Sequence, residues 1–158
     1  MIPLLVVLGA LVVIGDVSPR WQLDLDESWR AVPTTDTAGG NILAAYSRAP
    51  GWRLVVARQR GNTDAAYDGD RTFTDGLEEG VRRDTGGYKR LSLKQRAITG
   101  RKVKIPVVDL WYRTDGGVRG TRFVIMKGYA VMATIDLPGS KKPDKLAKKV
   151  LEGFSLAR

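Results

Sequence analysis

Three alternating segments joined by short glycine turns constrain the fold of this chain more than any other feature. Apolar side chains recur at about every second position in residues 103–113, 120–126 and 129–137. That period is typical of strands that bury one face. Asp115-Gly116-Gly117 and Lys127-Gly128 separate the segments, and turns this short join antiparallel neighbours. The sequence therefore predicts an antiparallel meander.

Further strands and a first helix extend this pattern. Strands are expected at residues 21–26, 41–47, 52–59 and 88–98, and a loop at residues 61–70. Phe73, Leu77 and Val81 recur at the spacing of one helical stripe. We expect this helix to be capped by Thr72 and to end before the glycine pair that begins at Gly86.

A second helix closes the sequence. Pro143 suits a first helical turn, and an apolar stripe follows it at Leu146, Ala147, Val150, Leu151 and Phe154. Strands joined by tight turns with two helices added predict an α+β fold. We expect an antiparallel β-sheet of about six strands with two amphipathic helices packed on it.

The first sixteen residues set the expected compartment. Residues 2–15 carry no polar side chain. As a helix they rise about 21 Å, which is short of a bilayer core of about 30 Å. Their length fits a signal peptide, and Val13-Ile14-Gly15 suits a cleavage site, although no Lys or Arg precedes the run. We predict a signal peptide or membrane anchor at residues 1–16 and one domain at residues 17–158, which places the protein in the periplasm or on a membrane facing outside the cytoplasm. The alternative is a buried first strand, because Val and Ile favour strands.

The residue composition excludes several kinds of chemistry. The chain contains no cysteine and no histidine, so disulfides, thiolate nucleophiles, Cys/His zinc sites and Ser-His triads are excluded. Residues 68–79 resemble a calcium loop in their acidic positions, but Phe73 stands where that loop needs glycine. Asp24 and Asp26 are expected to face water rather than to act as an acid/base pair. We predict no catalytic residue, metal or cofactor, and no enzymatic activity.

Positive charge is concentrated in the second half of the chain. Residues 1–88 hold 9 Lys and Arg against 12 Asp and Glu, whereas residues 89–158 hold 17 against 5. One basic edge is predicted beside the last helix, at Lys141, Lys142, Lys145, Lys148 and Lys149, and another around a hairpin at Arg96, Arg101, Lys102 and Lys104. Neither has the interleaved aromatic side chains that nucleic-acid binding favours. An acidic protein face or an anionic lipid surface fits better, and a purely solvated surface is the alternative.

Trp111 is the most informative aromatic residue. On an alternating strand it lies opposite Leu110 and Tyr112 and next to Arg113. If one face of the sheet stays open, Trp111 is an exposed anchor for a partner. If helices cover both faces, it is buried. Trp111 and Arg113 are therefore candidate partner-binding residues together with the five lysines of the basic edge beside the last helix.

Several phrases of the sequence resemble the Mog1/PsbP-like superfamily, which includes DcrB-type lipoproteins and the effector-associated (Eag) chaperones of type VI secretion. The resemblance rests on Asp26–Trp29, Trp52–Arg58, Leu110–Arg113, Tyr129–Thr134 and Leu151–Phe154. Ser28 departs from the glycine usual in the opening motif. The resemblance implies a non-enzymatic accessory domain that binds another protein and is often membrane-associated. The Eag chaperones imply the alternative of a cytoplasmic adaptor that shields apolar helices of a client.

Overall fold

A computed structural model describes residues 10–14, 19–34, 41–100 and 103–157. Its elements are β1 (Ala10–Ile14), β2 (Trp21–Leu25), β3 (Arg30–Ala31), β4 (Ile42–Arg48), β5 (Trp52–Arg60), α1 (Asp64–Tyr67), α2 (Phe73–Asp84), β6 (Lys89–Gly100), β7 (Val103–Thr114), β8 (Gly117–Met126), β9 (Tyr129–Pro138), α3 (Lys145–Glu152) and β10 (Ser155–Leu156). The α+β class and the antiparallel strands that the sequence predicts are both confirmed.

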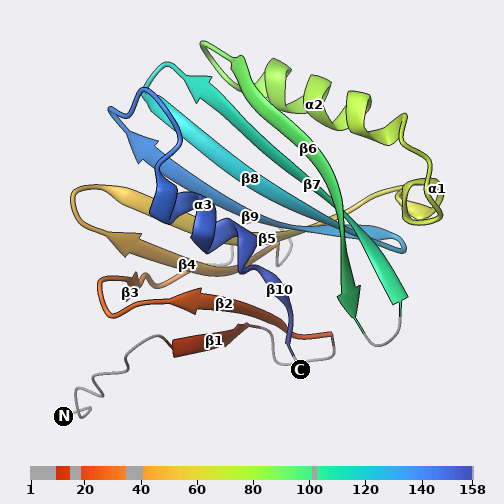
Figure 1. Cartoon of the computed structure of the whole chain (residues 1–158), viewed down its shortest axis with the longest axis horizontal. Coiled ribbons are helices and arrows are strands. Elements are labelled where there is room, and N and C mark those ends of the chain that lie inside the picture. Colours follow the sequence, from red (N-terminus) through yellow and green to blue (C-terminus); the bar gives the residue numbers. More distant parts are fainter. Residues whose placement is uncertain (1–9, 15–18, 35–40, 101–102, 158) are drawn as a thin grey trace.

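The strands form two sheets (Figure 1). Seven strands in the order β3-β4-β5-β9-β8-β7-β6 make the main sheet, and all its pairs are antiparallel. β2 belongs instead to a small sheet in the order β1-β2-β10. The β7–β8 and β8–β9 hairpins turn at the two glycine-containing sites that the sequence indicates.

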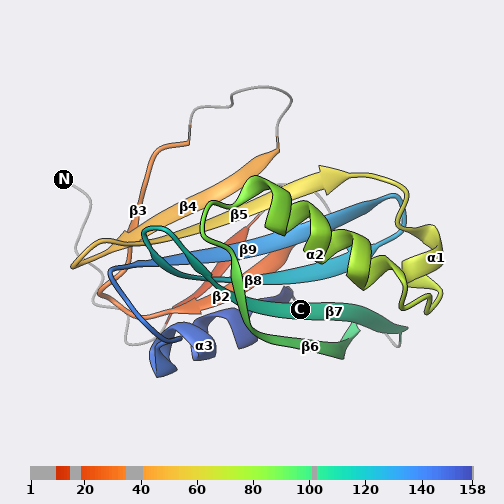
Figure 2. The same cartoon turned by 90° about the horizontal axis from the view of Figure 1, so that it is seen from above.

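The two faces of the main sheet carry different layers (Figure 2). On one face, α3 and the small sheet enclose the larger core, which includes Trp21, Leu23, Trp111, Val150 and Phe154. On the other face, α1 and α2 cover a smaller core of Val108, Leu110, Tyr112, Phe123 and Ile125 with partly buried side chains of α2. Because β7 contributes to both cores, its residues 107–112 are all buried.

Part of the apolar N-terminal segment is a strand. Residues 10–14 form β1 and pair antiparallel with β2, in register from Ala10 opposite Leu25 to Ile14 opposite Trp21. Ile14 is buried, whereas Leu11 and Val13 are exposed. This strand corresponds to the alternative that the sequence leaves open. Removal or membrane insertion of residues 1–16 remains a prediction, and residues 1–9 and 15–16 lie outside the described residues.

Both helices begin differently from the expectation. The Thr72 side chain makes no capping hydrogen bond on α2; its hydroxyl donates instead to Asp70 at 2.8 Å. Asp144 caps α3 by accepting from the backbone N–H of Leu146 and Ala147, so Pro143 precedes the cap rather than lying in the first turn. The sequence also did not predict a short helix: residues 64–67 form α1 inside the expected loop.

Candidate functional site

The structure places Trp111 in the core. Trp111 is 6% exposed and belongs to the core between the main sheet, α3 and the small sheet. Its ring lies flat over Gly120 on β8, where an added Cβ would stand 2.6 Å from three ring atoms. The idea of Trp111 as an exposed partner-binding anchor is therefore wrong for this fold, because layers on both faces of the sheet bury both sides of β7.

The other predicted site residues are all exposed and lie together. Arg113 and the five lysines of the basic edge, Lys141, Lys142, Lys145, Lys148 and Lys149, are exposed. The guanidinium of Arg113 donates to the backbone carbonyl of Lys141 at 3.3 Å, which joins the end of β7 to the loop before α3. The lysines of α3 lie outside its buried stripe. This arrangement leaves all six cations available to a partner.

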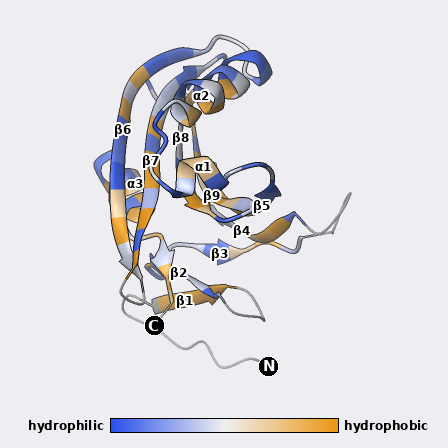
Figure 3. Cartoon of the chain, turned by 90° about the vertical axis from the view of Figure 1, so that its right-hand side faces the viewer, coloured by the Kyte–Doolittle hydropathy of each residue, from blue (hydrophilic) through white to orange (hydrophobic). Residues whose placement is uncertain are grey.

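Strand β6 extends this cationic surface. The register pairs Lys89 with Arg113 and Lys94 with Asp109, so both lysines lie on the α3 side of the sheet. β6 is the last strand of the main sheet and is hydrophilic over much of its length (Figure 3). We call the combined surface the basic face; its members are Lys89, Lys94, Arg96, Arg113, Lys141, Lys142, Lys145, Lys148 and Lys149.

Acidic side chains do little to neutralise the basic face. Within the described part of the chain, no lysine of this face forms an ion pair. Arg96 is the exception among the cations, with its Nε 3.4 Å from Asp109. Unpaired cations in one region attract anionic surfaces and accelerate their association.

The two described residues of the second predicted cluster, Arg96 and Lys104, lie on opposite faces of the sheet. Arg96 faces the α3 side, because it pairs with Val107 of the larger core. Lys104, three residues before Val107 on β7, lies on the opposite face. Arg101 and Lys102 lie outside the described residues. Of the two described members of this cluster, Arg96 belongs to the basic face and Lys104 does not.

A buried ion pair holds α3 against the main sheet. The carboxylate of Asp109 accepts two hydrogen bonds from Arg122, from Nε at 2.7 Å and from Nη2 at 2.8 Å. Nη1 of Arg122 also donates to the backbone carbonyls of Glu152 at 3.0 Å and Phe154 at 3.3 Å. Asp109 and Arg122 are both buried. This group fixes the C-terminal end of α3, and hence its lysines, to β7 and β8.

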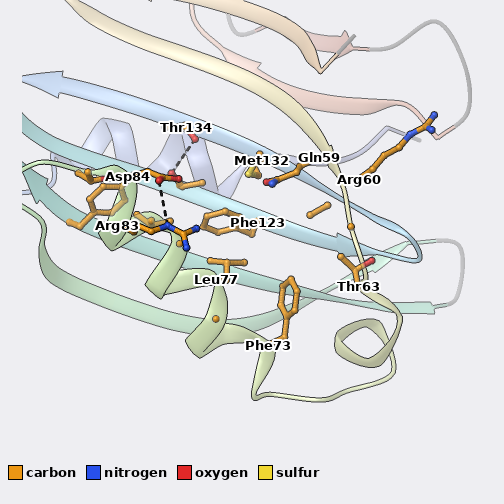
Figure 4. A pocket seen from close by; sticks show the side chains of 18 of the residues that line it. Gln59, Arg60, Thr63, Phe73, Leu77, Arg83, Asp84, Phe123, Met132 and Thr134 are labelled. Atoms are coloured by element: carbon orange, nitrogen blue, oxygen red, sulfur yellow. Dashed lines mark hydrogen bonds and ion pairs between the residues drawn. The ribbon is translucent and has the colours of Figure 1, made fainter. Parts of the chain in front are cut away.

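The opposite face of the main sheet contains a cavity of about 590 Å³ (Figure 4). Its roof is α2, from which Phe73, Leu77 and Val81 line it. Its floor is the main sheet, with Phe123 and Met132 among the lining residues. Sequence reasoning missed this site. The only signal was the pair Gly76 and Gly80, which lies in a helix that is otherwise well specified.

Glu78 fastens α2 to the edge of the sheet beside this cavity. Its carboxylate accepts from Nε of Arg90 at 2.6 Å, from a second nitrogen of Arg90, and from the Tyr88 hydroxyl at 2.5 Å. The Arg90 hydrogen bonds lower the pKa of Glu78 from 4.5 to about 2, against the opposing effect of burial. Burial, followed by the hydrogen bond to Glu78, raises the pKa of the Tyr88 hydroxyl to about 12. The roof is thus anchored along one side.

This anchor makes stability depend on pH. A carboxyl whose pKa is lower in the folded state stabilises the fold above its unfolded pKa, and this contribution is lost as the pH falls from about 4.5 towards about 2. We expect Glu78→Gln to lower the free energy of unfolding by about 1–2 kcal/mol at neutral pH, because Arg90 is half exposed, and by less near pH 3. Urea denaturation at both pH values measures this. Glu79→Gln, in an exposed pair with Arg82, is the control. An equal loss at both pH values would contradict the assignment.

The described residues contain no group of three or more His, Cys, Asp or Glu side chains that could hold a metal ion. In the same part of the chain, no helix is long and apolar enough to cross a bilayer.

The comparisons with known proteins identify a fold. No protein-family model matches the chain, and no curated protein matches its sequence. Among solved structures, the chain is similar to the solution structure of cyanobacterial PsbP (CyanoP) from Synechocystis sp. PCC 6803, with a TM-score of 0.56 and 11% sequence identity over 96% of this chain and 95% of that chain. The chain therefore has a PsbP-like fold.

Proposed function

We propose that this chain is a non-enzymatic accessory domain that binds an acidic surface of another protein through its basic face. The observation that carries the proposal is the clustering of nine exposed cations from β6, β7, the loop before α3 and α3, with only Arg96 in an ion pair among the described residues. The lack of imidazole and thiol groups supports a binding rather than a catalytic role. The PsbP-like fold is compatible with it.

The apolar N-terminal segment supports a location outside the cytoplasm. In this proposal residues 1–16 export the domain or hold it at a membrane, so that its partner is a membrane protein or a complex at the membrane surface. A basic face near an anionic membrane also gains about 1 kcal/mol per cation, which helps to concentrate the domain there.

Neutralising lysines of α3 tests the basic face. We expect Lys145→Gln, Lys148→Gln and Lys149→Gln together to reduce recovery of the partner from the native host about tenfold at low salt, and to weaken the salt dependence of binding. Quantitative mass spectrometry of cross-linked complexes measures the recovery.

The matched control removes the same charge elsewhere. Arg30→Gln, Arg60→Gln and Arg71→Gln also delete three exposed cations, but none belongs to the basic face. This variant is expected to recover the partner as the parent does. If both variants recovered equally little partner, the loss would follow from net charge rather than from the basic face, and the proposal would be contradicted. Binding to vesicles of anionic phospholipid without recovery of any protein would assign the basic face to lipid instead.

A cytoplasmic adaptor that shields apolar helices of a client is the second candidate. Strand β1 favours it, because residues 10–14 pair with β2 as part of the domain and Ile14 is buried. The N-terminal residue of the protein from its native host separates the two candidates. An intact Met1 on protein that fractionates away from membranes would contradict the export proposal, whereas a terminus near Asp16 would contradict the adaptor.

A further inference from the structure

We propose that the cavity between α2 and the main sheet binds a small neutral molecule with an apolar body and one hydrogen-bonding end. This site lies on the face of the sheet opposite to the larger core and α3, so the proposal is independent of the basic face. A cavity of about 590 Å³ falls within the range of about 300–1,000 Å³ that is typical of sites for small organic ligands.

The apolar side chains that line the cavity are incompletely covered by the protein. Phe73, Leu77 and Val81 of the roof are only partly buried, as is Met132 of the floor, whereas Phe123 is buried. Figure 4 shows Phe73 and Leu77 projecting from α2 towards the side chains of the sheet. Partial burial of a roof and a floor that face each other leaves apolar surface for a ligand to cover.

Two glycines keep the roof hollow at a cost in helix stability. Gly76 and Gly80 lie one turn apart within α2, and both line the cavity. A Cβ at either position would meet no atom within 4 Å, so packing within this chain does not require glycine there. Glycine in a helix interior is less stable than alanine. Space for a ligand explains why the sequence accepts that loss twice.

Two hydroxyl groups lie side by side in the lining of the cavity. The hydroxyls of Thr121 and Thr134 lie 3.1 Å apart in its lining. Arg119 lines the same region, but its Nε donates to Asp136 at 2.6 Å. Each hydroxyl can both donate and accept. The region around the two hydroxyls therefore suits a hydroxyl or amide group of a ligand.

The least exposed charged group of the lining, Arg119, is already paired, which favours a neutral ligand. Arg119 is paired with Asp136, and Nε of Arg83 lies 3.8 Å from the carboxylate of Asp84. Arg60 extends away from the cavity in Figure 4. A charged ligand would lose its hydration inside the cavity, where Arg119 already has its carboxylate partner.

Binding of the neutral fluorophore phenylnaphthylamine tests the site. We expect the parent protein to bind one molecule with a blue-shifted emission. Gly80→Leu is expected to weaken this binding at least about tenfold by filling the cavity, without lowering the melting temperature, because it replaces a helix glycine in open space. Glu79→Leu, which adds the same side chain on the exposed side of α2, is the matched control and should bind as the parent does.

The outcomes separate the possibilities. A folded parent that binds no phenylnaphthylamine, or equal binding by Gly80→Leu and Glu79→Leu, would overturn the proposal. If Gly80→Leu unfolds, Gly76→Leu provides the same test from the neighbouring turn. Anilinonaphthalene sulfonate is an anionic relative of the probe, and we expect Gly80→Leu not to change its binding. The assignment of a neutral ligand would be overturned if the parent bound this anion as tightly as the neutral probe and Gly80→Leu abolished that binding.

Discussion

Trp111→Ala is expected to lower the free energy of unfolding by about 3–5 kcal/mol, the cost of removing a large aromatic side chain from a packed core. The residue is 6% exposed, and its ring occupies the space that Gly120 leaves open on the neighbouring strand. No backbone shift can easily close such a cavity between two paired strands. Urea denaturation followed by circular dichroism measures the effect.

Leu91→Ala is the matched control for this change. Leu91 is 37% exposed on the edge strand β6, at the register shift between Arg90 and Ser92. We expect it to cost about 1 kcal/mol or less. A Trp111→Ala variant as stable as the parent that nevertheless lost its partner would restore the exposed anchor and contradict the core position.

Asp109→Ala is expected to be similarly destabilising, by about 3–5 kcal/mol, because it leaves the guanidinium of Arg122 buried without its carboxylate. Arg122 is 4% exposed and would retain only the two backbone carbonyls at the end of α3. Chemical denaturation of the variant measures the loss.

Asp136→Ala provides the matched comparison for the buried pair. It breaks the Arg119–Asp136 pair, which also crosses the main sheet but is about one third exposed on both sides. Ion pairs with that access to water contribute about 1 kcal/mol or less. Equal effects of Asp109→Ala and Asp136→Ala would show that burial does not set the strength of the Arg122 contact.

The sequence predicted best those elements whose signals are local. Glycine turns and a period of two specify the hairpins of β7, β8 and β9, and these strands end within a few residues of the expected bounds. The apolar stripe at helical spacing predicted α2 equally clearly. By contrast, β10 has two residues and α1 has four, which is too short for any period to appear.

The sequence could not assign strands to sheets or side chains to faces. Residues 21–25 form a strand as expected, but their partners are residues 10–14 and 155–156, which are distant in sequence or outside the predicted domain. Strand β7 is buried on both faces from Val107 to Tyr112, so alternation alone does not decide which side Trp111 occupies. Pairing and layer order depend on contacts that no local pattern encodes.

The candidate sites also divide into residues that a local pattern predicts and residues that depend on long-range contacts. The lysines of α3 were predictable, because a helical stripe places them outside the core. Lys89 and Lys94 were not, because their side of the sheet depends on the register shift at Leu91. The cavity depends on the distance between α2 and the sheet, which the sequence does not specify.

The pairing of β2 with β10 affects how this domain is made. Ser155 and Leu156 pair with Gln22 and Trp21, and the backbone N–H of Ala157 donates to the carbonyl of Arg20 at 2.9 Å. Because β10 and α3 stand at the end of the sequence, residues 20–25 leave the ribosome long before the segments that pair with them and cover them are synthesised. During synthesis the apolar side of this early strand therefore stays without its final cover until the last segment of the chain emerges.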